Sequence, residues 1–247
     1  ALPVLSAMGC NTAVLPTALL STHTAFESPY CKDLTQELLP IARHWKKVGA
    51  EFDVIGVGYL ASPEQAETVA RVLEDFSGIV AVDPVMGDHG KLYAGITPAH
   101  TAAVAKLCRR ANVLLPNVTE ACLLTGTSYT EDPDRVFYEK LLEAMRKFGA
   151  ETVILTGVSL APGQTGVMGF DGQKTFSYQT QQLPRVCHGT GDLFAAVVMG
   201  AIASGKTAEQ SAVLAADFVC RVIQATKDSS PFGVEFESQL PWLWENL

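Results

Sequence analysis

Short apolar runs alternate with amphipathic stretches along most of the chain. The runs rich in branched aliphatic side chains predict strands over residues 11–16, 52–58, 79–82, 112–115 and 152–155. The stretches with apolar residues at helical spacing predict helices over residues 63–76, 98–111, 118–124 and 134–148. Strands that alternate with helices favour a parallel sheet with helices on both faces.

Local signals indicate where several helices begin. Ser62 and Thr97 each precede a proline, an order typical of an N-cap followed by the first helical residue. Asp33 with Gln36 predicts a capping box for an earlier helix, and Pro40 should kink or restart that helix.

The alternation changes after residue 160. Two β-rich runs, residues 165–170 and 174–180, flank an Asp-Gly pair and predict a hairpin. A glycine-rich turn and two long helices should follow, over residues 189–191, 192–204 and 208–226. The apolar tail at residues 238–247 should dock on the body. The chain shows no linker and no repeat, so we expect one domain over residues 1–247.

Composition excludes several classes of protein. Hydrophobic residues make up 48% of the 247 positions and charged residues 18%, which excludes intrinsic disorder. The formal charge is −8, and the basic pairs at residues 46–47 and 109–110 lie near predicted helix ends, where cations complement the helix dipole. No apolar run reaches the roughly 18 residues needed to cross a bilayer. We therefore expect neither a nucleic-acid nor a membrane partner.

The six cysteines are scattered and contain no Cys-x-x-Cys pair or zinc spacing. In a chain of this size without a secretory signal, that pattern favours reduced thiols and a cytoplasmic location. His23 and His188 also lack a partner at metal spacing, so we expect no transition metal.

The strongest candidate site is the turn at Gly189, Thr190 and Gly191, followed at once by Asp192 and a long apolar helix. Glycines let backbone N–H groups converge, and a helix start adds partial positive charge, so the turn predicts an anion cradle suited to phosphate. Asp192 has two interpretations: a structural helix N-cap, or a base that takes a proton from an alcohol attacking the phosphate.

Two other strand ends carry acids. Asp83 and Asp88 lie in a glycine-containing loop and could hold Mg²⁺ through water and phosphate oxygens. The alternative is an ordinary surface turn. Glu120 follows the next strand and could be a second metal-side carboxylate, or a first-turn glutamate that favours the helix dipole.

Hydroxyl and aromatic side chains gather at residues 21–26, beside a predicted strand end, and would suit a small polar ring. An ordinary loop is the alternative. Residues 200–207 match the Walker A pattern but join two predicted helices, so we interpret the match as accidental. A Gly-x-Gly-x-x-Gly opening a first strand–helix unit is absent, which argues against a Rossmann dehydrogenase.

Taken together, these motifs resemble the ribokinase-like superfamily and, within it, the pyridoxal kinases. The similarity runs through residues 15–17, 21–26, 58–60, 83–88, Tyr93, 116–120 and 189–196. It implies a three-layer α/β/α sandwich with a mostly parallel sheet, and a homodimer. It also implies ATP-dependent phosphorylation of the 5′-hydroxymethyl group of vitamin B6, with Mg²⁺ and often a monovalent cation such as K⁺.

The resemblance also implies roles for single residues. Asp192 would be the catalytic base, and Gly189, Thr190 and Gly191 would form the anion hole. Thr24 matches a position that touches the pyridine substrate, and we expect His23 and Asp192 to bind that substrate too.

Metal and nucleotide residues follow from the same resemblance. The metal–phosphate residues would be Asp83, Asp88 and Glu120. The ATP-binding residues would be Asp88, Tyr93, Leu115, Glu120, Thr156, Gly157, Gly189 and Gly191. Residues 177–186 match a flap over ATP.

The chain departs from the pattern in two places. Its first nine residues predict the later part of a helix that ends at Gly9. The family's amino-terminal strand, with a substrate-contacting serine, is not in this chain, and we expect that strand and a turn to precede this helix. Ala25-Phe26 replaces a more polar pair of some members. The related hydroxymethylpyrimidine kinases often carry Cys where Asp192 stands, which favours the pyridoxal branch.

Two other functions stay open. One is a hydroxymethylpyrimidine or small-sugar kinase on the same fold. The other is a non-catalytic module that binds B6 or a nucleotide, an interpretation motivated by the missing strand and opposed by the intact Asp192.

Overall fold

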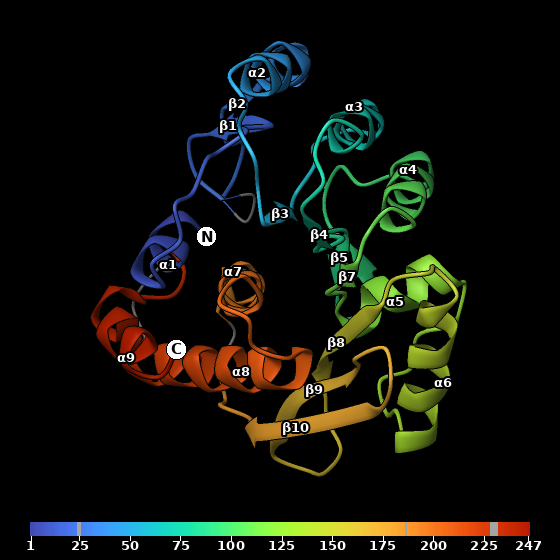
Figure 1. The fold of residues 1–247 in the computed structure, drawn as a ribbon. Helices are drawn as coiled ribbons and strands as arrows, with labels where there is room; N and C mark the ends of the chain where they lie inside the picture. The colour runs from blue at the N-terminus through green and yellow to red at the C-terminus, as the bar shows by residue number, and fades with distance from the viewer. Residues whose placement is uncertain (24–25, 186, 228–231) are drawn as a thin grey trace.

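A six-stranded mixed sheet forms the centre of the structure (Figure 1), a computed structural model that describes residues 1–23, 26–185, 187–227 and 232–247. Its strands are β3 (Val54–Val57), β4 (Ile79–Val82), β7 (Val113–Leu114), β8 (Thr152–Val158), β9 (Gln164–Phe170) and β10 (Thr175–Gln181). They lie in the order β10-β9-β8-β7-β4-β3. The pairs from β3 to β8 are parallel, and β9 and β10 add an antiparallel hairpin.

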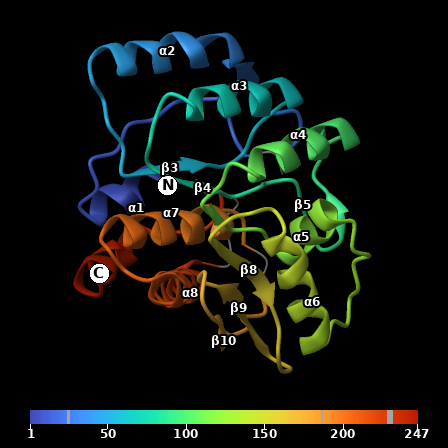
Figure 2. The ribbon, with the colours of Figure 1, turned by 45° about the vertical axis from the view of Figure 1, so that its right-hand side comes forward.

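Helices cover both faces of this sheet, each over its own apolar core (Figures 1 and 2). One layer contains α2 (Thr35–Lys47), α3 (Pro63–Leu73), α4 (Pro98–Cys108), α5 (Val118–Thr125) and α6 (Arg135–Arg146). The other contains α1 (Leu2–Ala7), α7 (Thr190–Ala203), α8 (Ala208–Ala225) and α9 (Leu240–Glu245), with the short 3₁₀ helix η1 (Glu237–Gln239) before α9. The predicted three-layer α/β/α architecture is confirmed. In the described ranges, every helix falls short of the length and apolarity that spanning a bilayer requires.

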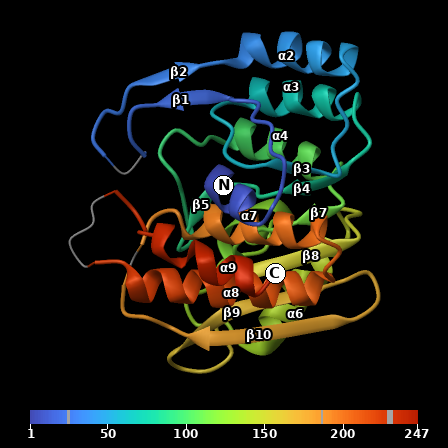
Figure 3. The same ribbon diagram turned by 60° about the vertical axis from the view of Figure 1, so that its left-hand side comes forward.

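Two small ribbons stand apart from the main sheet. β1 (Ala18–Leu20) pairs antiparallel with β2 (Cys31–Asp33) near α2 and α3 (Figure 3). β5 (Gly87–Asp88) pairs with β6 (Lys91–Leu92) in the loop that follows β4. The β5–β6 ribbon follows the carboxyl end of β4, and the Thr17 hydroxyl at the base of the β1–β2 ribbon donates to Tyr59 O in the loop after β3. The carboxyl ends of the strands are where α/β folds bind ligands.

Predictions based on local chemistry are confirmed. Ser62 and Thr97 cap α3 and α4 through their side chains, each with a proline in the first turn. The predicted hairpin forms, because β9 and β10 pair antiparallel on either side of Asp171 and Gly172. Gly200 lies inside α7, whereas Thr207 caps α8. The Walker-like match is therefore a helix–helix connection.

Two predictions near the amino terminus are wrong. Residues 11–16 form no strand, because Leu15 packs on a core instead of pairing, and the strand begins at Ala18. The capping box at Asp33 does not form: α2 begins at Thr35, whose N–H donates to the Asp33 carboxylate at 2.7 Å. Pro40 lies inside α2, which runs on without restarting.

Helix α7 is held tightly on two sides. A Cβ atom on Gly56 of β3 would lie 2.3 Å from Met199 Sδ, and one on Gly200 would lie 2.6 Å from Met8 Sδ. Only glycine allows so close an approach. On the same face, Leu243 of α9 is fully buried and the ring of Trp242 stacks on Phe218, which confirms that the tail docks.

His100 of α4 is the one buried side chain in the described ranges with an unpaired polar atom, Nε2. Only 1% of the residue is exposed, and burial lowers its pKa below the ordinary 6.5. A hydrogen bond with the backbone of Leu60 opposes this shift. The neutral ring therefore belongs to the folded state, whereas the unfolded chain takes up a proton below about pH 6.5.

We therefore predict that His100→Gln weakens the acid sensitivity of folding. Between about pH 7.5 and pH 5.5 the free energy of unfolding should fall more in the wild type than in the variant, by up to about 1.4 kcal/mol per pH unit below pH 6.5. Urea denaturation at both pH values measures the difference. Equal pH dependence in the two proteins would contradict the assignment.

Candidate functional site

Four predicted acids lie around one tyrosine at the carboxyl edge of the parallel strands. The pKa of Tyr93 is raised to about 12, first by burial and then by the charges of Asp88, Glu120, Asp83 and Asp192. Asp83 directly follows β4 and Asp88 ends β5, whereas Glu120 and Asp192 lie in the first turns of α5 and α7. The structure therefore brings together the separate motifs of the sequence.

The amino end of α7 is open to solvent. Gly189 is its N-cap with φ +89°, and no side chain caps the helix. By contrast, side chains cap α3, α4, α5, α6 and α8. Helical structure begins at Thr190, two residues before the predicted start, so Asp192 is the third helical residue. The interpretation of Asp192 as an N-cap is therefore wrong.

This helix start fits an anion. The first backbone N–H groups of a helix have no intrahelical acceptor, and the helix dipole adds partial positive charge there. Gly191 has open space where a Cβ would stand, and Gly189, Gly191 and Asp192 are all exposed. A phosphate group could therefore reach these amides directly.

Asp83 lies close enough to Asp192 to be affected by its charge. It lies directly after β4, where its N–H donates to Val57 O at 2.8 Å. Burial raises the pKa of the Asp83 carboxyl to about 7, with the charge of Asp192 as the second cause. Two acids on different layers of the fold are thus close enough to repel each other.

Glu120 is 3% exposed and ties two loops together. One carboxylate oxygen accepts from Met86 N at 3.1 Å and the other from Asn117 N at 2.9 Å, in a capping box at the start of α5. Burial, and then the charge of Asp83, raise the pKa of Glu120 well above its ordinary value, although these backbone hydrogen bonds oppose the shift. The first-turn interpretation of Glu120 thus describes its contacts in the structure.

Two neighbours of Glu120 hold the same loop, and the sequence analysis did not single them out. Asn117 Nδ2 donates to Gly87 O at 2.8 Å, and Thr119 Oγ1 accepts from Gly90 N at 2.9 Å. Their place in the turn after β7 was the available signal. Asp88, on this loop, keeps its side chain 49% exposed, 3.6 Å from His89 Nε2.

Asp83, Asp88 and Glu120 provide the hard oxygen donors that Mg²⁺ prefers. Across the described residues, no three His, Cys, Asp or Glu side chains gather closely enough to hold a metal ion alone. The donor set nevertheless fits Mg²⁺, which usually binds one or two carboxylates together with phosphate oxygens and water. A cation would also relieve the repulsion between the Asp83 and Glu120 carboxylates.

The predicted nucleotide residues form the next part of this edge. Thr156 N donates to Pro116 O at 3.0 Å, and Gly157 makes a bulge in β8 with φ +74°. Leu115 is different, because its side chain is buried in the core beneath α7 and only its backbone can face a ligand.

Aromatic rings gather beside the start of α7, and they include His23, one of the predicted substrate residues. The His23 ring lies 4.7 Å from that of Phe26 and 5.0 Å from that of His188, between ring centroids. Phe26 in turn stacks on Phe232 at 5.7 Å. Thr24, the other predicted substrate residue, lies outside the described residues. Phe232, which the sequence analysis did not single out, carries no motif that would have identified it.

The predicted flap is anchored at two points. Its first residues belong to β10, where Tyr178 OH donates to the Asp217 carboxylate at 2.7 Å. Further along, the Arg185 guanidinium donates to Ile223 O and Thr226 O, at the end of α8. Val186 lies outside the described residues.

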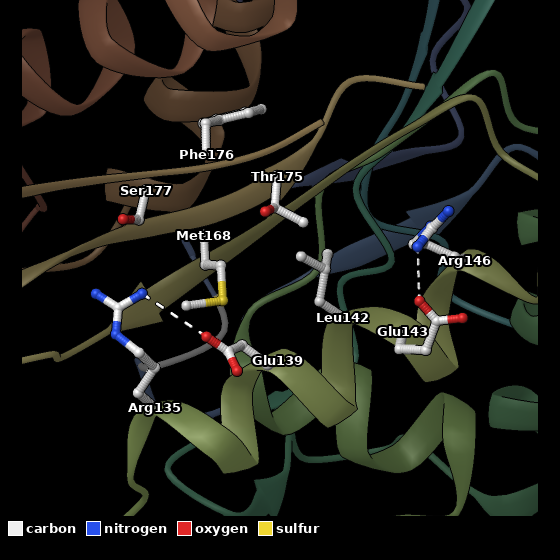
Figure 4. A pocket seen from close by; sticks show the side chains of 9 residues that line it. All are labelled: Arg135, Glu139, Leu142, Glu143, Arg146, Met168, Thr175, Phe176 and Ser177. Carbon is white, nitrogen blue, oxygen red and sulfur yellow. Dashed lines mark hydrogen bonds and ion pairs between the residues drawn. The ribbon is translucent and has the colours of Figure 1, made fainter. Parts of the chain in front are cut away.

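A separate cavity of about 380 Å³ opens between α6 and the β9–β10 hairpin (Figure 4). Its floor contains Leu142 and Met168, and its rim carries the ion pairs Arg135–Glu139 and Arg146–Glu143. None of the predicted catalytic, substrate, ATP or metal residues lines it. We therefore place the candidate site at the acidic edge of the sheet and not here.

Comparison with known proteins gives consistent matches. The sequence model of the phosphomethylpyrimidine kinase family matches residues 2–235. A pyridoxine/pyridoxal/pyridoxamine kinase of Bordetella avium is 29% identical, over 92% of this chain and 79% of its own. A hydroxymethylpyrimidine/phosphomethylpyrimidine kinase of Haemophilus influenzae is 31% identical, over 68% of this chain and 63% of its own.

A solved structure extends the match to three dimensions. The crystal structure of pyridoxal kinase from Lactobacillus plantarum has a TM-score of 0.91 and 33% identity, over 99% of this chain and 90% of that one.

We predict that Asp83→Asn stabilises the protein at high pH. The raised pKa means that the wild type keeps the full stability from this group only below about pH 3.8, and loses it as the pH rises through about 7. A neutral amide avoids that loss, so the variant should be more stable at about pH 8, by about 1 kcal/mol or more, and the gain should shrink toward about pH 5. Denaturation at both pH values tests this, with the exposed Asp132→Asn as the control. An equal difference in the free energy of unfolding between variant and wild type at both pH values would contradict the prediction.

Proposed function

Because this chain belongs to the phosphomethylpyrimidine kinase family, we propose that it transfers the γ-phosphoryl group of ATP to the 5′-hydroxymethyl group of pyridoxal, pyridoxamine or pyridoxine. The observation that carries the proposal is the open amino end of α7, with Asp192 in its first turn and Asp83 close to it. Phosphoryl transfer needs a preformed anion site beside a base, and this edge supplies both.

Two of the matched proteins are kinases named for B6 vitamers, which supports a B6 vitamer as the acceptor. The Bordetella avium kinase matches over more of this chain than the Haemophilus influenzae kinase does, although its identity is slightly lower. The Lactobacillus plantarum pyridoxal kinase matches nearly the full length. Asp192 also stands where the resemblance gives hydroxymethylpyrimidine kinases a cysteine.

In the mechanism that we propose, the backbone N–H groups at Thr190 and Gly191 hold the transferring phosphoryl group. Asp192 takes the proton of the acceptor alcohol. Transfer is loose, so the alcohol oxygen becomes acidic as its bond to phosphorus forms, and a carboxylate can then act as the base.

Three carboxylates stand beside the phosphate path. Asp83 and Asp88 would hold Mg²⁺ together with phosphate oxygens, while Glu120 keeps their loop in place. Bound there, Mg²⁺ would offset the charge of the phosphates. The homodimer and the monovalent cation that the resemblance implies stay predictions, as does the cytoplasmic location that the scattered cysteines favour.

The second candidate is a hydroxymethylpyrimidine kinase, which the match to the Haemophilus influenzae protein favours. An ADP-release assay with each B6 vitamer, hydroxymethylpyrimidine and ribose as acceptors separates the candidates. Turnover with hydroxymethylpyrimidine or ribose alone would overturn the proposal. Tight pyridoxal binding in calorimetry without ATP turnover would indicate a binding module.

We predict that Asp192→Asn lowers kcat by about 10²–10⁴-fold, the usual contribution of a general base. Its affinity for ATP should change little, because the helix amides remain. Steady-state kinetics and nucleotide calorimetry measure the two effects. Asp53→Asn is the control, because Asp53 is exposed and lies just before the amino end of β3, whereas the candidate site lies at the carboxyl ends of the strands. Near-normal turnover in Asp192→Asn would show that Asp192 is not the general base.

We predict that Gly191→Ala folds normally and binds ATP poorly. Its Cβ would meet no atom of the protein within 4 Å, so the melting temperature should stay unchanged. The same methyl group would stand where a phosphate approaches the helix amides, and the KM for ATP should rise by about tenfold or more. An unchanged KM for ATP would place the phosphate elsewhere.

A further inference from the structure

We propose that Gln65 is a positioning residue for the acceptor: it fixes the β1–β2 arm to the loop after β3 and so sets how tightly the acceptor binds. The β1–β2 arm is defined here as residues 17–23 and 26–33. Which acceptor is meant rests on the proposed function, but the structural part of the inference does not.

Gln65 joins three separate segments through one buried amide. It lies in the first turn of α3 and is 0% exposed. Its Oε1 accepts from Ala61 N at 2.8 Å, in the loop between β3 and α3. Its Nε2 donates to Thr17 O at 2.8 Å and to Asp33 Oδ2 at 3.2 Å, the two ends of the β1–β2 arm. The side chain therefore closes the base of the arm and attaches it to the loop.

Besides Gln65, the start of α2 holds this end of the arm, because Leu34 N donates to Thr17 O at 3.0 Å and Thr35 N donates to the Asp33 carboxylate at 2.7 Å. Each strand has three residues, and most of their side chains are exposed, including Leu19 and Leu20. A two-stranded ribbon is only marginally stable by itself. The Thr17 hydroxyl adds one long hydrogen bond to Tyr59 O, at 3.4 Å. Polar contacts at the base, with the Gln65 amide at their centre, therefore set the position of the arm.

The far end of the arm reaches the amino end of α7, the helix that carries Asp192. Ser21 and Tyr30 close the ribbon, with Ser21 N donating to Tyr30 O at 2.9 Å and Tyr30 N donating to Ser21 Oγ at 3.0 Å. Beyond them, the His23 ring lies 5.0 Å from that of His188, the residue before Gly189. A shift at the base would thus change the distance between His23 and the amino end of α7.

This geometry predicts an effect on one substrate and not on the other. The acceptor must fit between the arm and α7, whereas the phosphate site is built from α7 and the ends of β4 and β7. Small errors in the placement of a bound reactant strongly reduce productive binding. Loss of the Gln65 contacts should therefore raise the KM for the acceptor and leave that for ATP nearly unchanged. A purely structural role in α3 would not distinguish the two substrates.

Two variants and a control test the inference. Gln65→Leu removes all three hydrogen bonds. Gln65→Glu keeps the acceptor for Ala61 N but, when ionised, cannot donate to Thr17 O and repels Asp33. Asp33 stays ionised at neutral pH, because hydrogen bonds from Thr35, and more weakly from Gln65, lower its pKa. Gln36→Leu, an exposed glutamine on α2, is the matched control.

Hydrogen exchange of residues 17–33, measured without any substrate, is the first readout. Exchange should rise in both Gln65 variants and stay unchanged in the control. Acceptor and ATP kinetics are the second readout, and the KM for the acceptor should rise by about fivefold or more in both variants, with less than about a twofold change for ATP. The KM of Gln65→Glu for the acceptor, divided by that of the wild type, should fall as the pH is lowered, because a protonated carboxyl can again donate to Thr17 O.

Unchanged exchange in both Gln65 variants, or equal rises of the two KM values, would overturn the inference. If Gln65→Leu fails to fold, the Glu variant and its pH dependence decide the question. If the wild type phosphorylates none of the acceptors, the proposed function fails by itself. Increased exchange together with weaker pyridoxal binding in calorimetry would then still support Gln65 as a positioning residue.

Discussion

A buried carboxylate joins the two turns on which the acidic edge of the sheet depends. Glu120 gives one oxygen to Met86 N and the other to Asn117 N, so the loop after β4 and the first turn of α5 form one unit. Burying a carboxylate is costly unless it is hydrogen-bonded, and the raised pKa of Glu120 shows that part of this cost remains. Asp83, Asp88 and Tyr93 all follow β4 and are placed by this contact.

The site therefore combines two opposite electrostatic environments. Acids from β4 and β7 form one side, and the uncapped start of α7 forms the other. A polyanion alone would be repelled by the acids, and a cation alone would be repelled by the helix dipole. A phosphate that carries its own counterion suits both sides. An amino end of α7 without a side-chain cap leaves its backbone N–H groups available for such a phosphate, whereas α3, α4, α5, α6 and α8 have side-chain caps.

Much of this arrangement could be predicted from sequence where the cause is local. The β4 run ends at a turn, and the side chains of Ser62 and Thr97 cap the helices that follow them. The turn before α7 was also identified, although two residues of it are already helical. Prediction failed where tertiary contacts decide, as at Leu15, which packs on the core in a run that looks like a strand.

Buried polar residues were the main omission. Gln65 sits in an amphipathic helix, and nothing in the periodicity separates it from a solvent-facing glutamine. Its partners lie as far as 48 positions away in sequence, so only the folded chain shows the connection. The same holds for Phe232 and Phe26, whose rings meet although they are far apart along the chain.

The glycine contacts of α7 also have a consequence for chemical ageing. The sulfur atoms of Met8 and Met199 lie where a single methyl group on Gly200 or Gly56 could not fit. Oxidation to the sulfoxide adds a polar oxygen atom to the sulfur, and that oxygen would have to enter the same tight space. Oxidation of either thioether would push on α7, the helix that carries Asp192, although Asp192 itself would not be modified. The durability of the active centre is thus linked to how well two remote sulfur atoms are shielded from oxidants.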